Sequence, residues 1–572
     1  MLLLACGVVG VSPAAAMADG ALTILAEDAN VRTAGGRLQP GEASEGGWNL
    51  WNNGELGEYV KFLAGGSHTI TVRAGGTPAK GAWPSMAIRL DGRQIGEALS
   101  VEKKGFDDYV FKVEVAAGTH RVTVAFLNDA AVPDPGKPGI WLEDRNLFVN
   151  RIAIQSGAGG KTPVLANFED FPREYAMQEA KILQDADKQI EQVRKADATI
   201  RVVDAQGKPV PDATVAAKLV RHEFLFGCNI YMFDRFKTAE ENDLYKKRFA
   251  DLFNYATVGF YWRGYEPVRG RPNYAYTDKV VAWCGERGIR MKGHPLLWGL
   301  EYGIPPWSKG QPDANTQRER VTEILRRYGG KITLWEVVNE PSHIAEPKID
   351  PPYRWARTAD ANAYLIVNDY QVLADGCPPF LALLKRAQAD GVPFDGIGIQ
   401  AHEPRTMRFA LDQVKDILDR YAQLHKDLHI TEFTPASSGD PITGSLITGT
   451  WNEKAQEDYA VKFYRVCFAH PAVKGITWWD LCDQGSWLAG GGMLRKDLSP
   501  KPVYNSLMTL LHKTWRTQTQ GVTDEAGRFR FRGFLGQYDV TATAGGKTVR
   551  ANYPLTRQTK TGEAPAWVVT VP

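Results

Sequence analysis

Two glutamates in this chain stand in short motifs that suit acid and nucleophile chemistry. Glu340 lies in WEVVNEP (335–341) and Glu432 lies in HITEF (429–433), 92 positions apart (432 − 340). Each motif ends an apolar run of the length of a buried strand, and in a barrel the carboxyl ends of parallel strands meet at one face. One carboxylic acid and one carboxylate at such a face are the groups that hydrolysis of a glycosidic bond requires. The pair therefore predicts a glycosidase active site.

Further polar and aromatic residues follow the other predicted strands. A polar group at the end of an apolar strand costs free energy unless it is hydrogen-bonded or functional. For any one of these residues a satisfied hydrogen bond in the core is an equally good interpretation, but together they predict one site. They are His294 after the third strand, Asn339 beside Glu340 on the fourth, Gln400 and His402 on the sixth, and Trp479 on the eighth.

The segment that carries these residues, 222–515, alternates strand-like and helix-like stretches. Helical stretches such as YTDKVVAWCGERG and LALLKRAQADG separate the strands. Eight β/α units in about 290 residues predict a (β/α)8 TIM barrel of the α/β class. The strand candidates are HEFLFGCNI, FNYATVGF, IRMKGHPLLW, TLWEVVNE, AYLIVNDY, GIGIQAH, LHITEF and GITWWDL.

Segments rich in β-strand patterns flank the barrel on both sides. Residues 19–156 alternate apolar and polar positions between frequent turn signals, which predicts a jelly-roll-like β-sandwich. A linker and a charged helix (174–195) account for 157–197. Residues 198–221 and 516–572 each contain too few strands to hide their sheet edges. We therefore predict that the two pieces form one small immunoglobulin-like sandwich that the barrel interrupts.

The first 18 residues predict a signal peptide, because an apolar run is followed by small residues and a cleavage site before Asp19. The expected location is secreted or periplasmic. Leu3 to Gly7 is also similar to a bacterial lipobox, which would place a lipid anchor on Cys6. No other stretch approaches the roughly 20 apolar residues that a membrane span requires. We expect the chain to be a monomer.

The composition narrows the classes of partner. Sixty-eight Lys and Arg against 66 Asp and Glu leave a net charge of +2, so nothing indicates nucleic acid or an anionic membrane surface. The six cysteines are scattered without the spacing of metal ligands, and both buried free thiols and one disulfide stay open. Sixteen Trp and 21 Tyr suit stacking on sugar rings as well as core packing.

Residues 222–515 resemble glycoside hydrolase family 10, the endo-β-1,4-xylanase family. WEVVNEP is similar to the family's acid/base motif, which implies that Glu340 is the general acid/base and that Asn339 binds the 2-hydroxyl of the cleaved sugar. ITEF resembles the nucleophile motif, which implies that Glu432 is the nucleophile. The resemblance implies retaining hydrolysis of a β-glycan, most readily xylan, without a cofactor.

Three more motifs, GIGIQAH, KGHPLLW and GITWWDLCDQGSW, extend the resemblance. They imply residues that would support the glutamates or bind sugar. These are Gln400 facing the active site, His402 hydrogen-bonded to the nucleophile, His294 and Trp298 around the cleavage-point sugar, Trp479 as a sugar platform, and Trp487 further along the cleft.

The segment FNYATVGFYWRGYEPVRG (253–270) departs from the family pattern. The family usually has an Asn and a Lys here that hold sugars on the non-reducing side of the cut, but Val258 and Tyr261 stand in their places. Trp262 matches the family, and Tyr261 or Arg263 is a candidate substitute for the missing contacts. A glycosidase of the same fold that is exo-acting, or specific for another β-glycan or for an aglycone, is therefore an alternative to an endo-acting xylanase.

The N-terminal sandwich contains a pattern similar to carbohydrate-binding module families 36 and 60, which bind xylan through calcium. Asn128, Asp129 and Asp144 match its acidic and amide positions. Such oxygen ligands suit Ca²⁺, and turn-capping by the same side chains is the structural alternative. A non-catalytic glycan-binding protein is the functional alternative from another class, and the presence of both Glu340 and Glu432 argues against it.

Overall fold

The structure is a computed structural model that describes residues 17–18, 20–32, 35–38, 45–133, 141–166, 171–343, 348–443, 447, 449–557 and 566–572. The chain forms two compact units that divide between Met177 and Gln178. Residues 1–16 of the predicted signal peptide, with Cys6, lie outside the described residues. Among the described helices, none is long and apolar enough to cross a membrane. The five cysteines from Cys228 onward are free and buried, which agrees with the thiol interpretation.

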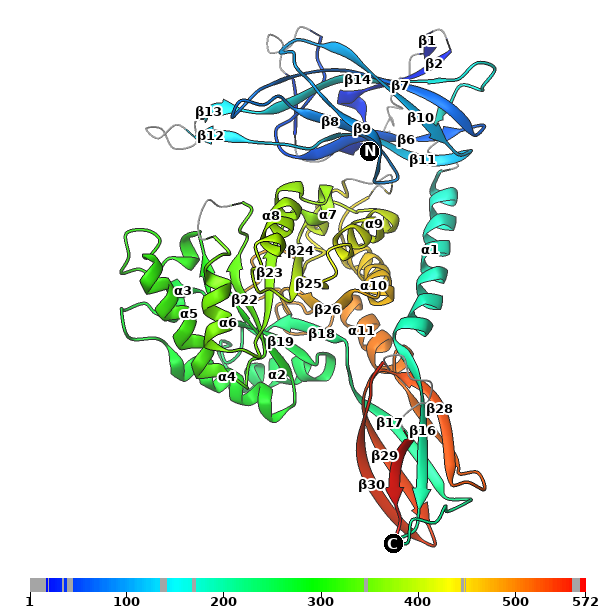
Figure 1. The fold of residues 1–572 in the computed structure, drawn as a ribbon, viewed down its shortest axis with the longest axis vertical. Helices are drawn as coiled ribbons and strands as arrows, with labels where there is room; N and C mark the ends of the chain where they lie inside the picture. Colours follow the sequence, from blue (N-terminus) through cyan, green and yellow to red (C-terminus); the bar gives the residue numbers. More distant parts are fainter. Residues whose placement is uncertain are drawn as a thin grey trace, which may run out of the picture. The chain divides into compact units, whose positions relative to one another are not determined.

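The N-terminal unit is built around two antiparallel sheets, and a separate pair of strands, Ala131–Pro133 and Trp141–Asp144, forms a small third sheet (Figure 1). In β10, Phe111, Val113 and Val115 point inward while the residues between them are exposed, so one face of the strand enters the core. The strands are β1 (Met17–Ala18), β2 (Ala21–Leu25), β3 (Val31–Arg32), β4 (Gly36–Arg37), β5 (Trp48–Leu50), β6 (Gly54–Phe62), β7 (Gly66–Thr77), β8 (Ser85–Leu90), β9 (Arg93–Ser100), β10 (Asp107–Val115), β11 (Gly118–Phe126), β12 (Ala131–Pro133), β13 (Trp141–Asp144), β14 (Asn146–Ser156) and β15 (Val164–Leu165), with a short helix η1 (Ala26–Asp28).

The second unit contains a small sandwich whose strands come from both sides of the barrel. β16 (Lys195–Val203) pairs with β28 (Arg528–Phe534) and with β31 (Ala566–Thr570). β17 (Thr214–His222) lies between β27 (Gln518–Val522) and β29 (Gly536–Ala544), and β30 (Lys547–Leu555) covers the outer edge of β29. Each N-terminal strand is thus central in its sheet, and neither flank supplies a complete sheet alone.

The remainder of this unit is the predicted barrel. Its strands are parallel and close into a ring, because β20 (Arg290–His294) pairs with β22 (Leu334–Asn339) as well as with β19 (Tyr255–Gly259). All eight predicted strands are present, and the (β/α)8 fold is confirmed. The strands are β18 (Leu225–Asn229), β19 (Tyr255–Gly259), β20 (Arg290–His294), β22 (Leu334–Asn339), β23 (Tyr364–Asp369), β24 (Gly396–Ala401), β25 (Asp427–Phe433) and β26 (Val473–Trp478), with a short β21 (Leu297–Trp298).

Helices surround the strands, and some of them start at a side chain that caps the first turn. Thr238 and Glu241 form a reciprocal capping box at the start of α2, and Asn452 caps α10. The helices are α2 (Ala239–Leu252), α3 (Trp262–Tyr265), α4 (Tyr274–Glu286), α5 (Ala314–Tyr328), α6 (Pro352–Ala359), α7 (Val372–Asp375), α8 (Pro378–Ala389), α9 (Leu411–Ala422), α10 (Glu453–Ala469) and α11 (Pro502–Thr509), with short turns η2 (Glu301–Gly303), η3 (Glu403–Arg405) and η4 (Leu510–Thr514).

Helix α1 (Phe171–Val193) lies against the outside of the barrel through its C-terminal part. Leu183, Ala186 and Ile190 join the barrel's hydrophobic core. Glu179 is buried and forms ion pairs with Arg408 at 2.9 Å and with Lys462 at 2.8 Å. The helix is therefore attached by apolar contacts and by a buried carboxylate that depends on its cationic partners.

Removing the charge of Glu179 should destabilise this unit. Without the Glu179 charge, buried Arg408 and partly buried Lys462 lose their buried acidic partner and retain the half-exposed Asp458, so Glu179→Gln is expected to lower the free energy of unfolding by about 3 kcal/mol. Asp187→Asn is the matched control, because Asp187 lies on the same helix as Glu179 and pairs with Arg465 of α10, but its side chain is 55% exposed. Loss of this exposed ion pair should lower the free energy of unfolding by less than about 1 kcal/mol. Urea unfolding of both variants measures the difference, and equal effects would contradict the argument.

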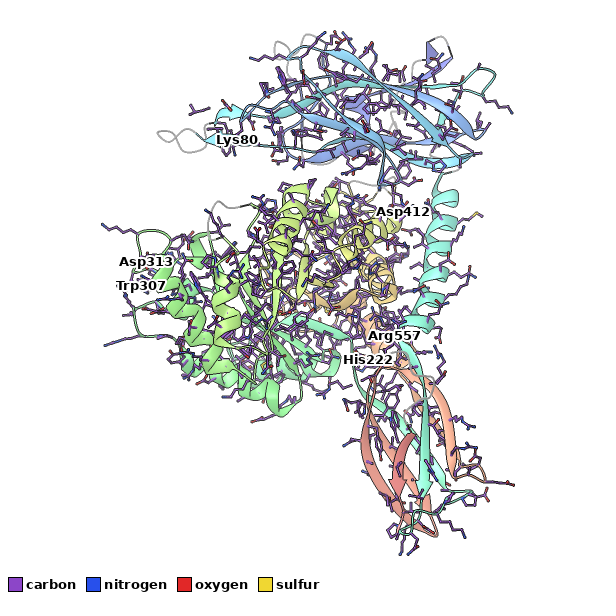
Figure 2. All side chains as sticks on the ribbon, viewed as in Figure 1. Lys80, His222, Trp307, Asp313, Asp412 and Arg557 are labelled. Atoms are coloured by element: carbon purple, nitrogen blue, oxygen red, sulfur yellow. The ribbon has the colours of Figure 1, made fainter. Side chains whose placement is uncertain are left out.

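An aromatic cluster joins the small sandwich to the barrel. His222, labelled in Figure 2, meets Phe226 of β18, Phe468 of α10 and Phe534 of β28 edge to face. Arg194 donates hydrogen bonds to the carbonyl oxygens of Phe468, His470 and Val473. The junction is thus buried and hydrogen-bonded, as expected of parts that pack as one unit.

Candidate active site

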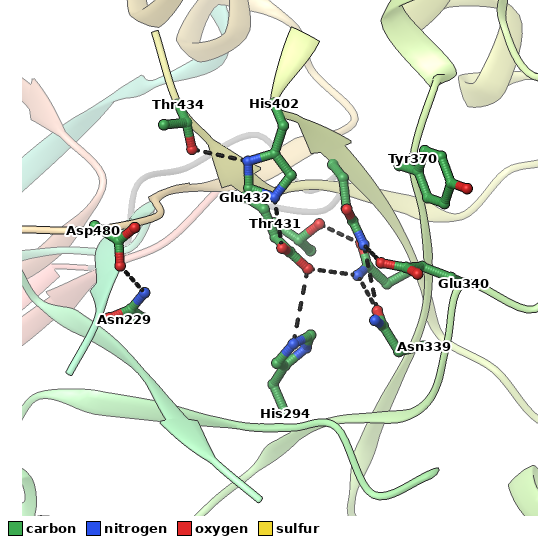
Figure 3. A network of polar contacts seen from close by, with 12 residues as sticks. Asn229, His294, Asn339, Glu340, Tyr370, His402, Thr431, Glu432, Thr434 and Asp480 are labelled. Carbon is green, nitrogen blue, oxygen red and sulfur yellow. Dashed lines mark hydrogen bonds and ion pairs between the residues drawn. The ribbon is translucent and has the colours of Figure 1, made fainter. Parts of the chain in front are cut away.

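Glu432 lies at the carboxyl end of β25 and is 4% exposed (Figure 3). Its Oε1 accepts a hydrogen bond from Asn368 Nδ2 at 3.0 Å, and its Oε2 accepts one from His402 Nε2 at 2.9 Å. Partners on both oxygens fix the orientation of this buried carboxyl group. His402 is held in turn by Thr434 Oγ1, 2.9 Å from its Nδ1.

Glu340 follows β22 in an unusual backbone conformation. Its φ is 55°, in the left-handed region that non-glycine residues seldom adopt. The pairing of β22 with β23 shifts register between Glu336 and Asn339, and the Glu340 N–H donates to the carbonyl oxygen of Asn368. This irregular strand end places the consecutive side chains of Asn339 and Glu340 in the same network (Figure 3). Strain of this kind is retained where the surrounding structure enforces it, often at functional sites.

The Glu340 carboxyl group is held by two donors. Gln400 Nε2 lies 3.0 Å from Oε1, and Trp298 Nε1 lies 3.0 Å from Oε2. Burial raises the pKa of Glu340, and the charge of Glu432 raises it further, while the hydrogen bonds from Gln400 and Trp298 oppose the shift. The net direction is upward, so Glu340 keeps its proton to a higher pH than an exposed glutamate does.

Three amide side chains connect the two carboxyl groups. Asn368 Nδ2 donates both to Glu432 and to Asn339 Oδ1, the latter at 2.9 Å. Gln400 Nε2 lies 3.0 Å from Glu340 and 3.4 Å from the same Asn339 oxygen. The Asn339 carbonyl is therefore shared by the neighbours of both glutamates. This network holds the two carboxyl groups in a defined relation while giving each a different electrostatic environment.

His294 lies on the side of Glu432 that faces away from His402 (Figure 3). Its Nδ1 contacts Glu336, which also forms an ion pair with Lys292, and all three side chains are buried. Burial acts to raise the pKa of Glu336, but the charges of Lys292 and His294 outweigh burial and lower it to about 2. His294 Nε2 is 3.9 Å from Glu432 Oε1. The Lys292 ammonium thus stabilises the buried Glu336 carboxylate, which in turn holds His294.

Comparison with known families decides what this site is. Residues 217–510, half of the chain, match the family model described as glycosyl hydrolase family 10. The chain belongs to glycoside hydrolase family 10. Residues 69–163 match a second model, described as a Ca-dependent carbohydrate-binding module that binds xylan. Both resemblances drawn from the sequence are confirmed.

The chain is also similar to individual curated proteins. It is 30% identical over 386 residues to the anti-sigma-I factor RsgI6 of Acetivibrio thermocellus, a match that covers 65% of this chain and 48% of the relative. It is 28% identical over 291 residues to endo-1,4-beta-xylanase B of Thermotoga neapolitana, and this match covers 46% of this chain and 81% of the relative. The chain spans about half the length, 48% and 43%, of two curated relatives, the second an endo-1,4-beta-xylanase 1 of Arabidopsis thaliana.

Among solved structures, the chain is similar to xylanase 10B of Thermotoga petrophila in complex with xylobiose. The two are 25% identical, the match covers 51% of this chain and 95% of the xylanase, and the TM-score is 0.44.

Of the aromatic residues predicted to bind sugar, Trp479 is buried beside the glutamates, the Tyr261 hydroxyl lies 3.0 Å from His294 Nε2, and Trp487 is exposed. Trp479 follows β26 and meets His294 and His402 edge to face, with ring centroids 5.3 and 5.8 Å apart. Trp487 is 56% exposed and contacts His402, so it is available for stacking on sugar. Tyr231, which sequence reasoning did not single out, meets Trp479 at 5.6 Å.

Two residues predicted to bind substrate lie elsewhere. Trp262 is 1% exposed, packs against Arg320 and Trp307, and donates its Nε1–H to Glu266 at 2.8 Å. The prediction of a sugar contact for Trp262 is therefore wrong. Arg263 is exposed and pairs with Glu301 at 3.3 Å, so it does not join the glutamate network. The chain enters helix α3 at this point, which turns one side chain into the core and the next toward solvent.

Sequence reasoning missed Lys292, Glu336 and Asn368 of this family 10 site. Lys292 and Glu336 carry opposite charges inside apolar strands that are neighbours in the barrel, which is a usable signal, since buried charges need partners. Asn368 lies near the end of the predicted strand AYLIVNDY but is not among the predicted site residues. Nothing in that motif alone indicates that its amide reaches a glutamate 64 residues away.

The predicted calcium ligands of the N-terminal module do not all fit. The Asn128 side chain accepts from Ser85 N–H at 2.6 Å and donates to the Trp83 carbonyl at 2.9 Å. Because both ends of its amide hold the backbone, we correct its assignment from ligand to framework. Asp129 and Asp144 fit better, since burial and the nearby charge of Asp144 raise the pKa of Asp129 to about 6. Asp129 Oδ1 is buried and has no hydrogen-bond partner among the described residues.

The pH dependence of this family 10 site should respond to Trp298. If Glu340 acts as the acid, kcat/KM falls as the pH rises through its pKa. Trp298→Phe keeps a ring but removes the N–H that favours the charged carboxylate, so the pKa of Glu340 should rise further. We expect the alkaline limb of the kcat/KM profile to move to higher pH. An unchanged or lower alkaline limb would show that this hydrogen bond does not tune the acid.

Proposed function

We propose that this protein is a retaining glycoside hydrolase that cleaves internal β-1,4 linkages of a plant-type polysaccharide, with xylan as the substrate. One observation carries the proposal: Glu340 and Glu432 stand at the carboxyl ends of two strands of one barrel, joined by amides, with Glu340 favoured in its neutral form. Retaining glycosidases use one carboxylic acid and one carboxylate nucleophile, and membership of glycoside hydrolase family 10 supports these two roles.

The proposed reaction has two displacements. Glu432 attacks the anomeric carbon, while the Glu340 proton passes to the glycosidic oxygen and the bond to the leaving sugar breaks. A glycosyl ester on Glu432 results. Glu340, now a carboxylate, takes a proton from water as the water oxygen attacks the same carbon and releases Glu432. Two inversions give net retention at the anomeric centre.

The comparisons support xylan as the substrate class. Several relatives carry the name endo-1,4-beta-xylanase, and the second matched model is described as xylan-binding. Endo action, rather than exo action, is also proposed from these names. A secreted or periplasmic location, inferred from the N-terminal sequence, suits a polymer that cannot enter a cell.

A glycan-binding role without turnover is the second candidate. It is favoured by the similarity to a protein named as an anti-sigma factor, whose name denotes regulation rather than hydrolysis. The complete pair of Glu340 and Glu432, with donors on both, supports hydrolysis instead.

A reducing-sugar assay on xylan, mixed-linkage β-glucan and mannan tests the proposal. We expect release from xylan with oligosaccharide products, and NMR during the first minutes should show the β-anomer formed first. Release of monosaccharide alone would favour exo action. Binding of xylan without any release of sugar would establish the second candidate.

A calcium ion would be held by Asp129 and Asp144 in the N-terminal module. It would supply a hard cation that sugar hydroxyls can ligate. The buried Asp129 oxygen that lacks a partner among the described residues is the observation that fits this role. Barrel chemistry does not require the ion.

Asp129→Asn should therefore weaken calcium binding by more than about tenfold, the loss that even an outer partner of a metal causes. Because the pKa of Asp129 is about 6, calcium binding should also weaken as the pH falls through about 6 and protonates it. Titration calorimetry with CaCl₂ measures both effects. Hydrolysis of a short soluble substrate is the control and should not change. If the variant binds calcium as tightly as the wild type, Asp129 is not a calcium ligand.

A further inference from the structure

A cavity of about 480 Å³ lies between the small sandwich and the barrel, at the amino ends of the barrel strands. Its lining includes Arg221 near the end of β17, Asn254 directly before β19, and Ile289 directly before β20. Because Glu340 and Glu432 stand at the carboxyl ends of their strands, this cavity is separate from the candidate active site. Its volume is that of a site for a small organic molecule.

The charge of this cavity is positive and comes from three separate elements. Arg221 belongs to the sandwich, Arg287 follows α4, and Arg516 follows η4. No Asp or Glu is among the described residues that line the cavity. Glu286 contacts Arg287 at 3.4 Å, but the two side chains are 71% and 44% exposed, and such surface pairs contribute little. Since guanidinium groups bind carboxylates through two parallel hydrogen bonds, the lining favours a ligand with a carboxylate.

The arginines keep donors for such a ligand. Arg221 Nη1 donates to the Gly288 carbonyl oxygen at 3.0 Å, and Arg516 Nη1 lies 3.4 Å from His512 Nδ1. His512 Nε2 lies 3.3 Å from the Leu252 carbonyl oxygen, so His512 donates there and accepts from Arg516. A guanidinium group has five N–H donors, and one contact on each arginine leaves the others for a bound anion.

His222 adds a polar atom of a different kind to the lining (Figure 2). Its Nε2 is buried and has no hydrogen-bond partner among the described residues. Burial lowers the pKa of His222 to about 4, so the imidazole is neutral near pH 7. A buried polar atom without a partner costs free energy. A hydroxyl group of a ligand satisfies it in either tautomer, because a hydroxyl both donates and accepts.

We propose that this cavity binds a sugar acid, a small molecule with one carboxylate and several hydroxyl groups. Arg221 and Arg516 hold the carboxylate, and Arg287 contributes from the exposed side. One hydroxyl contacts His222 Nε2, and apolar residues such as Leu252 face the carbon skeleton. The ligand contacts the barrel and the sandwich together, so its binding stabilises their junction. This site does not rest on the proposed hydrolysis.

Titration calorimetry of the full chain with sodium glucuronate at pH 7 tests the proposal, beside glucose and inorganic phosphate. We expect glucuronate to bind at least about tenfold more tightly than glucose, which lacks the charged group, and more tightly than phosphate, which lacks the carbon skeleton. Arg516→Gln and Arg287→Gln should each weaken glucuronate binding about tenfold or more. Lys513→Gln is the matched control, because Lys513 is an exposed cation next to His512 that does not line the cavity. Its effect should be less than about twofold.

Thermal unfolding supplies a second measurement. Glucuronate should raise the Tm of the wild type, and the increase should be smaller in Arg516→Gln. If Arg516→Gln does not fold, Arg287→Gln carries the test, since this half-exposed side chain lies outside the core. Equal binding of glucuronate and phosphate would overturn the assignment to a sugar acid. Absence of glucuronate binding, or binding that neither arginine variant weakens, would overturn the site itself.

Discussion

Glu432→Gln is expected to lower kcat on xylan by on the order of 10⁴ to 10⁶-fold, as happens when an enzyme loses its nucleophile. The amide is nearly the same size and can still contact Asn368 and His402, so the fold and substrate binding should survive. It cannot form the glycosyl ester. Initial rates of reducing-sugar release measure the effect, and Glu191→Gln, at an exposed carboxylate on α1, is the matched control with unchanged rates.

A chemical test separates loss of the nucleophile from general damage. In Glu432→Ala, azide can enter the vacated space and attack the anomeric carbon of an activated aryl glycoside directly. The product should be a glycosyl azide of inverted configuration, since only one displacement takes place. If Glu432→Gln keeps more than a few per cent of the wild-type rate, the assignment of Glu432 is wrong.

Glu340→Gln is expected to lower kcat on xylan by about 10² to 10⁴-fold, the usual contribution of a positioned general acid. The loss should depend on the leaving group. A dinitrophenyl glycoside departs without a proton, so its first displacement should remain fast and the glycosyl-enzyme should accumulate. A burst of dinitrophenol measured by stopped flow is the expected sign.

The pH profile of the same variant provides a second measurement. The alkaline limb that we attribute to Glu340, with its raised pKa, should disappear. Azide added to Glu340→Ala should give a glycosyl azide of retained configuration, opposite to that from Glu432→Ala. Equal losses for all leaving groups, together with an unchanged alkaline limb, would assign the acid to another residue.

The barrel could be predicted from the sequence because its strands are continuous apolar runs. Strands buried on both faces need such runs, and Glu340 and Glu432 stand where two of them end. Periodicity cannot show how a strand end is distorted. The register shift beyond Glu336 and the left-handed conformation of Glu340 depend on pairing with β23, which is distant in sequence.

The sequence predicts Asn339 and Gln400 as site residues, but the contacts of the amide network could not be predicted, for a related reason. Asn368, Gln400 and Asn339 come from three strands, and their contacts depend on side-chain direction rather than on spacing. The prediction for Trp262 was wrong because helix α3 begins at this residue. The helical backbone directs its side chain into the core, which the sequence motif does not reveal. Asn128 was misassigned because an amide that ligates a metal and one that holds a turn have the same local sequence.

The sandwich whose strands flank the barrel imposes an order of events during synthesis. Thr199 of β16 pairs with Ala566 of β31, 367 residues later (566 − 199). At about 5 to 20 residues per second, a ribosome needs roughly 20 to 70 seconds to make the intervening chain. During this interval β16 and β17 expose unpaired edges, which are sites of aggregation. The barrel is therefore synthesised while the sandwich is still incomplete. The last strand of the chain, β31, then pairs with β16, the first strand of the sandwich to be made.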